Sequence, residues 1–151
     1  MKTIFKPILF LFLLITFNSC SLKEECPSCF TPPVNFYFEF VDSTTGENLI
    51  TNGTYDPEQI QIINIDDEST IEYNLVTEDD LNIIKVSSIG WETEVVNYRF
   101  DLAGNELFTF RVDATRKNED CCSYTEYNEI AVSGIDYEIV DGTNIYKIKL
   151  D

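Results

Sequence analysis

The sequence predicts an all-β protein, a single antiparallel β-sandwich of about seven to nine strands over residues 34–151. Short runs in which apolar and polar residues alternate recur about every ten to fourteen residues, a spacing typical of strands in a sandwich or barrel. No stretch of about ten or more residues places its apolar side chains at the three-and-four spacing of a helix. A chain of this length buries roughly two-thirds of its unfolded surface, which is enough for one hydrophobic core and too little for two domains.

The first predicted strand covers residues 34–41, where Phe36, Phe38 and Phe40 share one face because successive side chains of a strand point to opposite sides. Residues 42–47 are predicted to form a hairpin connection, in which Gly46 can adopt positive φ. No internal repeat of fixed period is visible, so neither a propeller nor a solenoid is expected. The remaining predicted strands are residues 60–65, 71–76, 83–89, 95–102, 107–112, 127–132 and 145–150, with a turn at 103–105.

Residues 1–19 are predicted to be a signal peptide, with a basic end and an apolar stretch over residues 8–17. That stretch is about half of the roughly 20 residues that span a bilayer. Ser19 and Cys20 then place a thiol directly after a small residue, which resembles the lipobox of bacterial lipoproteins in the relaxed form usual in Bacteroidota. The resemblance implies cleavage before Cys20 and a lipid, including palmitate-type acyl chains, on its thiol. The alternative is a secreted protein cleaved elsewhere, with Cys20 an ordinary cysteine.

Residues 20–33 are predicted to be the lipidated cysteine and a tether, because they show no hydrophobic period and contain three prolines. Lys23, Glu24 and Glu25 resemble the lipoprotein export signal of Bacteroidota, which implies a position on the outer face of the outer membrane. A short acidic motif of this kind also occurs in solvated linkers, so a lipoprotein that faces the periplasm is the alternative.

Charge limits the partners of the mature chain. The full sequence has 10 basic and 27 acidic side chains. Removal of residues 1–19 takes away Lys2 and Lys6, which leaves 8 basic against 27 acidic side chains, a net charge of −19. Nucleic-acid binding, which depends on Lys and Arg, is not expected. Anionic headgroups are repelled for the same reason, so membrane attachment is expected through at least two acyl chains on Cys20.

Four further cysteines, Cys26, Cys29, Cys121 and Cys122, indicate disulfides in an exported chain. Three pairings are open. The two that cross between the tether and the Cys121–Cys122 loop are favoured, since a bridge between adjacent residues forces a strained peptide geometry. A crossed bridge closes a long loop and stabilises by roughly 4–5 kcal/mol in the chain-entropy model. It would also hold the loop at 121–122 within roughly 22 Å of the lipid, which leaves any ligand-binding loops at the opposite end. The alternatives are a four-thiolate zinc site and a redox pair at Cys26 and Cys29.

The sequence contains no histidine, which excludes Ser-His-Asp and Cys-His chemistry and removes the commonest metal ligand. Acidic clusters at residues 66–68, 78–80 and 119–120 lie in predicted turns, where solvated carboxylates are commoner than a catalytic pair. No cofactor is expected, and structural calcium remains an option because calcium takes oxygen ligands in irregular loops. Trp91 is a candidate ligand contact, with packing as the alternative. Asp42, Ser43 and Thr44 resemble the O-glycosylation motif of Bacteroidota exported proteins.

Residues 38–47 and the Cys-Cys loop resemble small surface lipoproteins of flavobacterial type, and the Asp-x-x-Thr-Gly turn is similar to one in transthyretin-like and immunoglobulin-like sandwiches. These resemblances imply location and fold but transfer no active site. We therefore expect a non-enzymatic surface module that binds an unknown protein or glycan. The alternatives are a structural envelope or adhesion subunit whose only partner is protein, and a carboxylate-dependent glycoside hydrolase.

Overall fold

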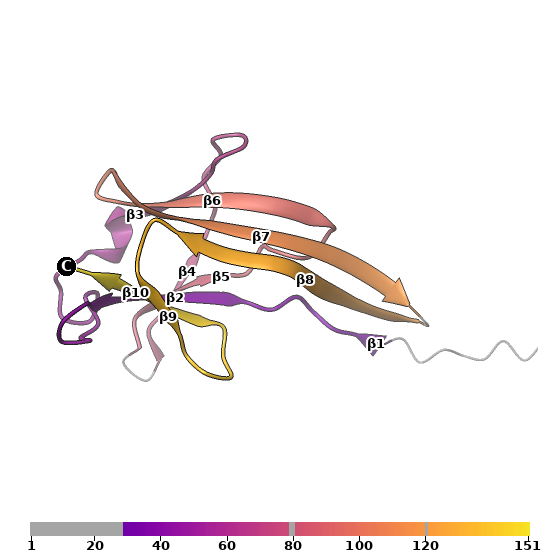
Figure 1. Cartoon of the computed structure of the whole chain (residues 1–151), viewed down its shortest axis with the longest axis horizontal. Helices are drawn as coiled ribbons and strands as arrows, with labels where there is room; N and C mark the ends of the chain where they lie inside the picture. The colour runs from indigo at the N-terminus through magenta and orange to yellow at the C-terminus, as the bar shows by residue number, and fades with distance from the viewer. Residues whose placement is uncertain (1–28, 79–80, 120) are drawn as a thin grey trace, which may run out of the picture.

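A computed structural model describes residues 29–78, 81–119 and 121–151. It confirms an all-β sandwich of two five-stranded sheets (Figure 1). Sheet A consists, in spatial order, of β1 (Cys29–Phe30), β8 (Cys122–Ser133), β7 (Asn105–Glu119), β6 (Glu94–Leu102) and β3 (Ile60–Asn64). Sheet B consists of β4 (Asn74–Val76), β5 (Ile83–Val86), β2 (Phe36–Asp42), β10 (Ile145–Leu150) and β9 (Tyr137–Ile139). A short 3-10 turn, η2 (Pro57–Gln59), precedes β3.

All eight predicted strands are present, and the two additional ones are β1 and β9. These two contain two and three residues, which is too short to leave an alternating pattern. The prediction of an antiparallel sandwich is wrong for two pairs, because β1 runs parallel to β8 and β2 runs parallel to β10. The alternation of apolar and polar residues shows which face of the sheet a side chain lies on, but it does not show the direction of the neighbouring strand. A parallel pair needs a long connection, which the rest of the domain provides here.

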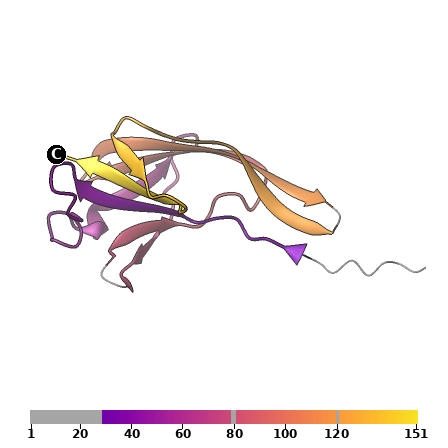
Figure 2. The same ribbon diagram turned by 60° about the horizontal axis from the view of Figure 1, so that its bottom comes forward.

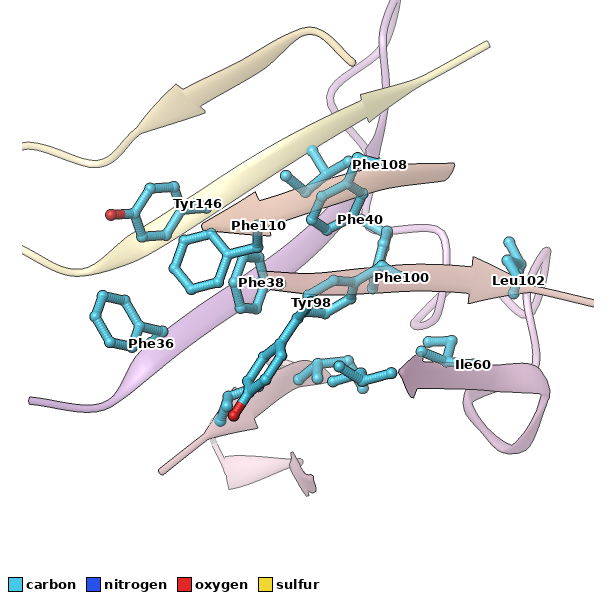
Figure 3. Close-up of a cluster of buried hydrophobic side chains, with 14 of the residues drawn as sticks. Phe36, Phe38, Phe40, Ile60, Tyr98, Phe100, Leu102, Phe108, Phe110 and Tyr146 are labelled. Carbon is cyan, nitrogen blue, oxygen red and sulfur yellow. The ribbon is translucent and has the colours of Figure 1, made fainter. Parts of the chain in front are cut away.

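The core is aromatic and lies between the two sheets (Figure 3). Phe36, Phe38 and Phe40 of β2 are buried on the face that their spacing predicts. The Phe38 ring lies 4.6 Å from the Phe100 ring and 5.0 Å from the Phe110 ring, measured between centroids. Each buried phenylalanine contributes roughly 1.5–3 kcal/mol through removal of apolar surface from water. Aromatic pairs add about 0.5–1.5 kcal/mol. The core therefore joins β2 of sheet B to β6 and β7 of sheet A.

Strands β7 and β8 form a hairpin that runs beyond sheet B toward β1 (Figures 1 and 2). The predicted strands at residues 107–112 and 127–132 cover only the half of this hairpin that packs on sheet B. The other half is polar on both faces, so alternation does not reveal it. A β-bulge between Asp113 and Ala114 separates the halves.

The predicted connection at residues 42–47 is a hydrogen-bonded turn. Gly46 has a φ of 73° and donates its N–H to the Asp42 carbonyl at 2.9 Å. The Asp42 carboxylate accepts hydrogen bonds from the N–H groups of Thr45 at 2.7 Å and Thr44 at 2.9 Å, which lowers the pKa of Asp42. The Ser43 hydroxyl donates to Asp151. The three residues of the suggested glycosylation motif therefore all take part in bonds that shape this turn.

Candidate binding site

The exposed face of sheet A has polar side chains in its centre. Along β6 and β7 the residues that face sheet B are buried, so the alternate residues Asn97 and Arg111 point outward. The strand register places Asn97 opposite Arg111, and Arg111 opposite Ala131 of β8. Three strands therefore contribute neighbouring side chains to one surface, although the residues are far apart in the sequence.

A hollow of about 400 Å³ lies on this face, within the usual size range of ligand sites. Ala131 and Ser133 are small, which leaves space above β8, and the segment that follows β3 forms the opposite wall. We call this feature the sheet A hollow. Its lining residues are Ile65, Asp66, Asn97, Thr109, Phe110, Arg111, Glu129, Ala131 and Ser133.

Four side chains form a continuous hydrogen-bonded row in the sheet A hollow. Arg111 donates from Nε to Glu129 Oε2 at 3.0 Å and from Nη1 to Asn97 Oδ1 at 2.9 Å. Asn97 then donates from Nδ2 to Asp66 Oδ2 at 3.1 Å. Arg111 and Glu129 are both substantially exposed, and such a surface ion pair contributes only about 0–1 kcal/mol to stability. A guanidinium has five N–H donors, so Arg111 retains donors for a ligand carboxylate, hydroxyl or carbonyl.

The carboxylates of the sheet A hollow do not have the surroundings of a general acid. Asp66 and Glu129 are exposed, and each accepts a hydrogen bond from a nitrogen donor. The catalytic acid of a glycoside hydrolase instead lies in an apolar pocket. This arrangement can hold a polar ligand, and it gives no support to a carboxylate pair for hydrolysis.

Trp91 lies outside the sheet A hollow, in the loop that joins β5 and β6. Its side chain is 51% exposed, its indole N–H donates to the Ser87 carbonyl at 3.0 Å, and its ring stacks on Phe30 with 6.2 Å between centroids. Arg116 lies over the same Phe30 ring at 5.0 Å. The candidate ligand contact is therefore beside β1, at the end of the domain where the predicted tether enters. Its use as a ligand contact stays a prediction.

Hydrogen bonds fix this end of the molecule. Arg116 donates from Nη1 to the Thr31 carbonyl at 3.0 Å and to the Thr125 hydroxyl at 2.8 Å, and that hydroxyl donates to the Gly90 carbonyl at 2.6 Å. Gly90 has a φ of 93°, and a Cβ there would lie 2.8 Å from Tyr127 Oη. We call this cluster, Phe30, Thr31, Gly90, Trp91, Arg116 and Thr125, the tether junction.

A disulfide joins Cys29 of β1 to Cys122 of β8, across 93 positions of sequence. The prediction of a disulfide that crosses from the tether to the 121–122 loop is confirmed. The bridge is incompatible with a redox pair between Cys26 and Cys29, with a bridge between Cys121 and Cys122, and with four free thiolates for zinc. Cys121 is also disulfide-bonded. Cys20, Lys23, Glu24, Glu25 and Cys26 lie outside the described residues, as does the predicted signal peptide at residues 1–19.

The acidic clusters have separate local roles where the structure describes them. Asp67 accepts hydrogen bonds from the Ser69 hydroxyl and N–H, which lower its pKa. Glu119 accepts one from the Tyr124 hydroxyl at 2.9 Å. Asp79, Asp80 and Asp120 lie outside the described residues. Over residues 29–78, 81–119 and 121–151, no group of three or more acidic or cysteine side chains is placed to hold a metal.

Sequence reasoning did not identify Asn97, Arg111 and Glu129 as site residues. Their outward position follows from alternation in the predicted strands, but their convergence depends on a register between strands that the sequence does not state.

Within the described residues there is no helix with the length and apolar character needed to span a membrane.

No protein-family model matches the chain, and neither the curated proteins nor the solved structures with which it was compared give a match. The fold and the site therefore describe the protein only structurally: it is a disulfide-bridged β-sandwich with a polar hollow on one sheet and an aromatic cluster at the end where its N-terminal segment enters.

Proposed function

We propose that this chain is a lipid-anchored lipoprotein of the outer membrane that faces the cell surface and acts as a non-enzymatic binding module, with its ligand in the sheet A hollow. The row of Asp66, Asn97, Arg111 and Glu129 is the observation that carries the proposal. Ordering long charged side chains at the surface costs side-chain entropy and adds little to stability. Because the ordered side chains add little to stability, ligand binding explains their arrangement better than stability does.

Several features support the anchoring part of the proposal. The apolar stretch before Cys20 has the length of a signal peptide, and the Lys23-Glu24-Glu25 motif resembles a surface-export signal. A disulfide between Cys29 and Cys122 suits an exported protein, because such bridges persist in oxidising compartments. We propose that Cys26 pairs with Cys121, which would leave Cys20 for the lipid.

The chemistry of the sheet A hollow favours a protein ligand over a glycan. Sugar sites commonly offer an aromatic face, and the one aromatic residue of the lining, Phe110, has its side chain buried in the core. Polar groups of a peptide or protein surface can use the free donors of Arg111 and the acceptors of Asp66 and Glu129. A glycan that used Trp91 would bind at the tether junction instead.

Site-specific photo-crosslinking on intact cells tests the proposal. A photoreactive amino acid replaces Ala131 in the sheet A hollow, and a control carries it at Lys85 on the exposed face of sheet B. We expect one defined protein adduct from position 131, none from position 85, and loss of the adduct in an Arg111→Ala background. The same adducts from both positions would refute a ligand in this hollow.

Surface exposure is tested separately by a membrane-impermeant protease or label. We expect the mature chain on intact cells to be reached without permeabilisation, and a known periplasmic protein to be protected. Protection of this chain would place it on the periplasmic side and overturn that part of the proposal.

A further inference from the structure

Strand β8 has a neighbour on both sides for only a short part of its length. It pairs with β7 from Cys122 to Ser133, whereas β1 pairs with Cys122 and Ser123 alone. In the part of the chain that the structure describes, no strand pairs with the other side of residues 124–133. We call residues 124–133 the open edge. The free side of an edge strand presents backbone N–H and C=O groups to which another strand can pair.

The sequence explains why β1 stops. Thr31 still donates its N–H to the Ser123 carbonyl at 2.8 Å. Pro32 and Pro33 follow, and proline has no N–H with which to continue a ladder. The chain then crosses into sheet B as β2. The open edge therefore begins where two prolines end its pairing.

Apolar side chains near the open edge face the interior and remain exposed. Ile130 lies opposite the buried residue Val112, so it points toward sheet B, yet it is 39% exposed. Strand β9 is the edge of sheet B, and Tyr137 and Ile139 lie opposite buried residues of β10. They are 40% and 46% exposed. Residues 134–136 join β8 to β9 (Figure 1). The exposure of these three inward-facing side chains indicates that the sandwich is incompletely closed along this side.

The charge of this side limits what can cover it. Residues 121–144, which form β8, β9 and their connections, contain five acidic side chains and neither Lys nor Arg. Three of the acids form ion pairs with cations of β7 and β10, which leaves a surplus of two negative charges. A second copy of this chain would bring the same acids to the contact, and like charges on facing strands are destabilising. Charge complementarity therefore favours a basic partner.

We propose that the open edge accepts an extended, basic segment of a partner protein as an added strand. Its backbone pairs with that of β8, and its alternate apolar side chains cover Ile130, Tyr137 and Ile139. This inference rests on the protein-binding part of the proposed function and names the class of partner. Strand addition combines main-chain hydrogen bonds for affinity with side-chain contacts for selectivity. The same added strand would place its other side chains toward Glu129 and Ser133, which line the sheet A hollow.

The test uses the full mature chain and a synthetic peptide of about ten residues, in which valine alternates with lysine and threonine. Binding is measured by fluorescence anisotropy, and hydrogen exchange read by mass spectrometry locates it. We expect slowed exchange at residues 124–133. We also expect binding to be lost when alternate peptide nitrogens are methylated, and to weaken about tenfold or more when glutamate replaces lysine. Absence of binding, equal binding of the acidic peptide, or protection elsewhere would overturn the inference.

Two matched variants separate the edge from the rest of the surface. Ile130→Lys places a charge on the open edge, and Val95→Lys introduces the same charge at a β-branched residue of β6 that is 46% exposed and away from this edge. We expect about tenfold weaker peptide binding for Ile130→Lys and none of this loss for Val95→Lys. Equal loss in both variants, or dimerisation of the chain through β8, would refute a basic partner strand.

The outcomes also distinguish this inference from the proposed function. If position 131 crosslinks to a partner but the peptide fails to bind, strand addition is wrong and the ligand in the sheet A hollow stands. If the peptide protects residues 124–133 but position 131 gives no adduct, strand addition stands and the ligand in the sheet A hollow is wrong. If peptide binding falls with Arg111→Ala and not with Ile130→Lys, the hollow alone holds the peptide and strand addition is overturned.

Discussion

Removal of the cysteine bridges should show how strongly the N-terminal strand β1 is coupled to β8. The Cys29–Cys122 bridge closes a loop of 93 positions. In the chain-entropy model a loop of that length is worth about 4.6 kcal/mol at 25 °C. Cys121 is also in a disulfide. If its partner is Cys26, either bridge alone holds nearly the same long loop closed.

The expected magnitudes follow from that arrangement. With one bridge intact, the second closes a small ring of about six residues, which the same model values at about 2 kcal/mol. The Cys29→Ser/Cys122→Ser variant should therefore lose about 2 kcal/mol of unfolding free energy. A variant with all four cysteines replaced should lose about 6–7 kcal/mol, because the long-loop term of about 4.6 kcal/mol disappears only then.

Urea unfolding followed by far-UV circular dichroism measures these differences as shifts in the transition midpoint at constant slope. Non-reducing peptide mapping of the same samples identifies which cysteines are joined. A loss of about 4–5 kcal/mol from the Cys29→Ser/Cys122→Ser variant, with Cys26 joined to Cys121, would refute the shared-loop reasoning. Equal stability of all variants would refute the entropic contribution altogether.

Three other perturbations test the packing and the turns. Phe38→Ala should cost about 3–5 kcal/mol in urea unfolding because it empties a site between both sheets, whereas Val95→Ala at an exposed site should change stability by less than about 0.5 kcal/mol. Gly90→Ala should destabilise the fold by about 1–3 kcal/mol, measured as a lower thermal midpoint, because a Cβ there would lie 2.8 Å from Tyr127 Oη. Gly53 has a similar φ but open space around it, so Gly53→Ala should cost less. Equal costs for the two variants would show that the close approach at Gly90 is unimportant. Hydrogen bonds from Thr45 and Thr44 lower the pKa of folded Asp42, so its contribution to stability is present above the unfolded value near 3.8 and is lost as pH falls through the folded pKa. Asp42→Asn should reduce the acid sensitivity of unfolding below about pH 4, and an unchanged pH profile would argue against that role.

The sequence predicts the parts of the fold in which one face of a strand is apolar. The alternation of Phe36, Phe38 and Phe40 locates β2 and its buried face without further information. The distal half of the β7–β8 hairpin escapes the same reasoning. Thr115 and Lys117 on one face and Arg116 and Asn118 on the other are all polar, because sheet B does not cover this half.

The candidate site was less predictable than the fold. Asn97, Arg111 and Glu129 belong to three strands, and only the register between them makes a row. The sequence suggests Trp91 as a candidate contact, with packing as the alternative, but it does not reveal that Phe30 stacks on it. The crossed disulfide could be predicted from the sequence because a bridge between the adjacent residues Cys121 and Cys122 would be strained. The choice of Cys122 over Cys121 for Cys29 depends on the register between β1 and β8, which spacing does not reveal.

The Cys29–Cys122 bridge also has a mechanical consequence. With the lipid anchor proposed above, a pulling force on the N-terminal segment would pass through the Cys29–Cys122 bond to the first residue of β8. A partner held along β8 would receive that force within the same strand. The aromatic core between β2, β6 and β7 would then lie outside the line of tension. The domain would then resist such a force without relying on the packing that keeps it folded.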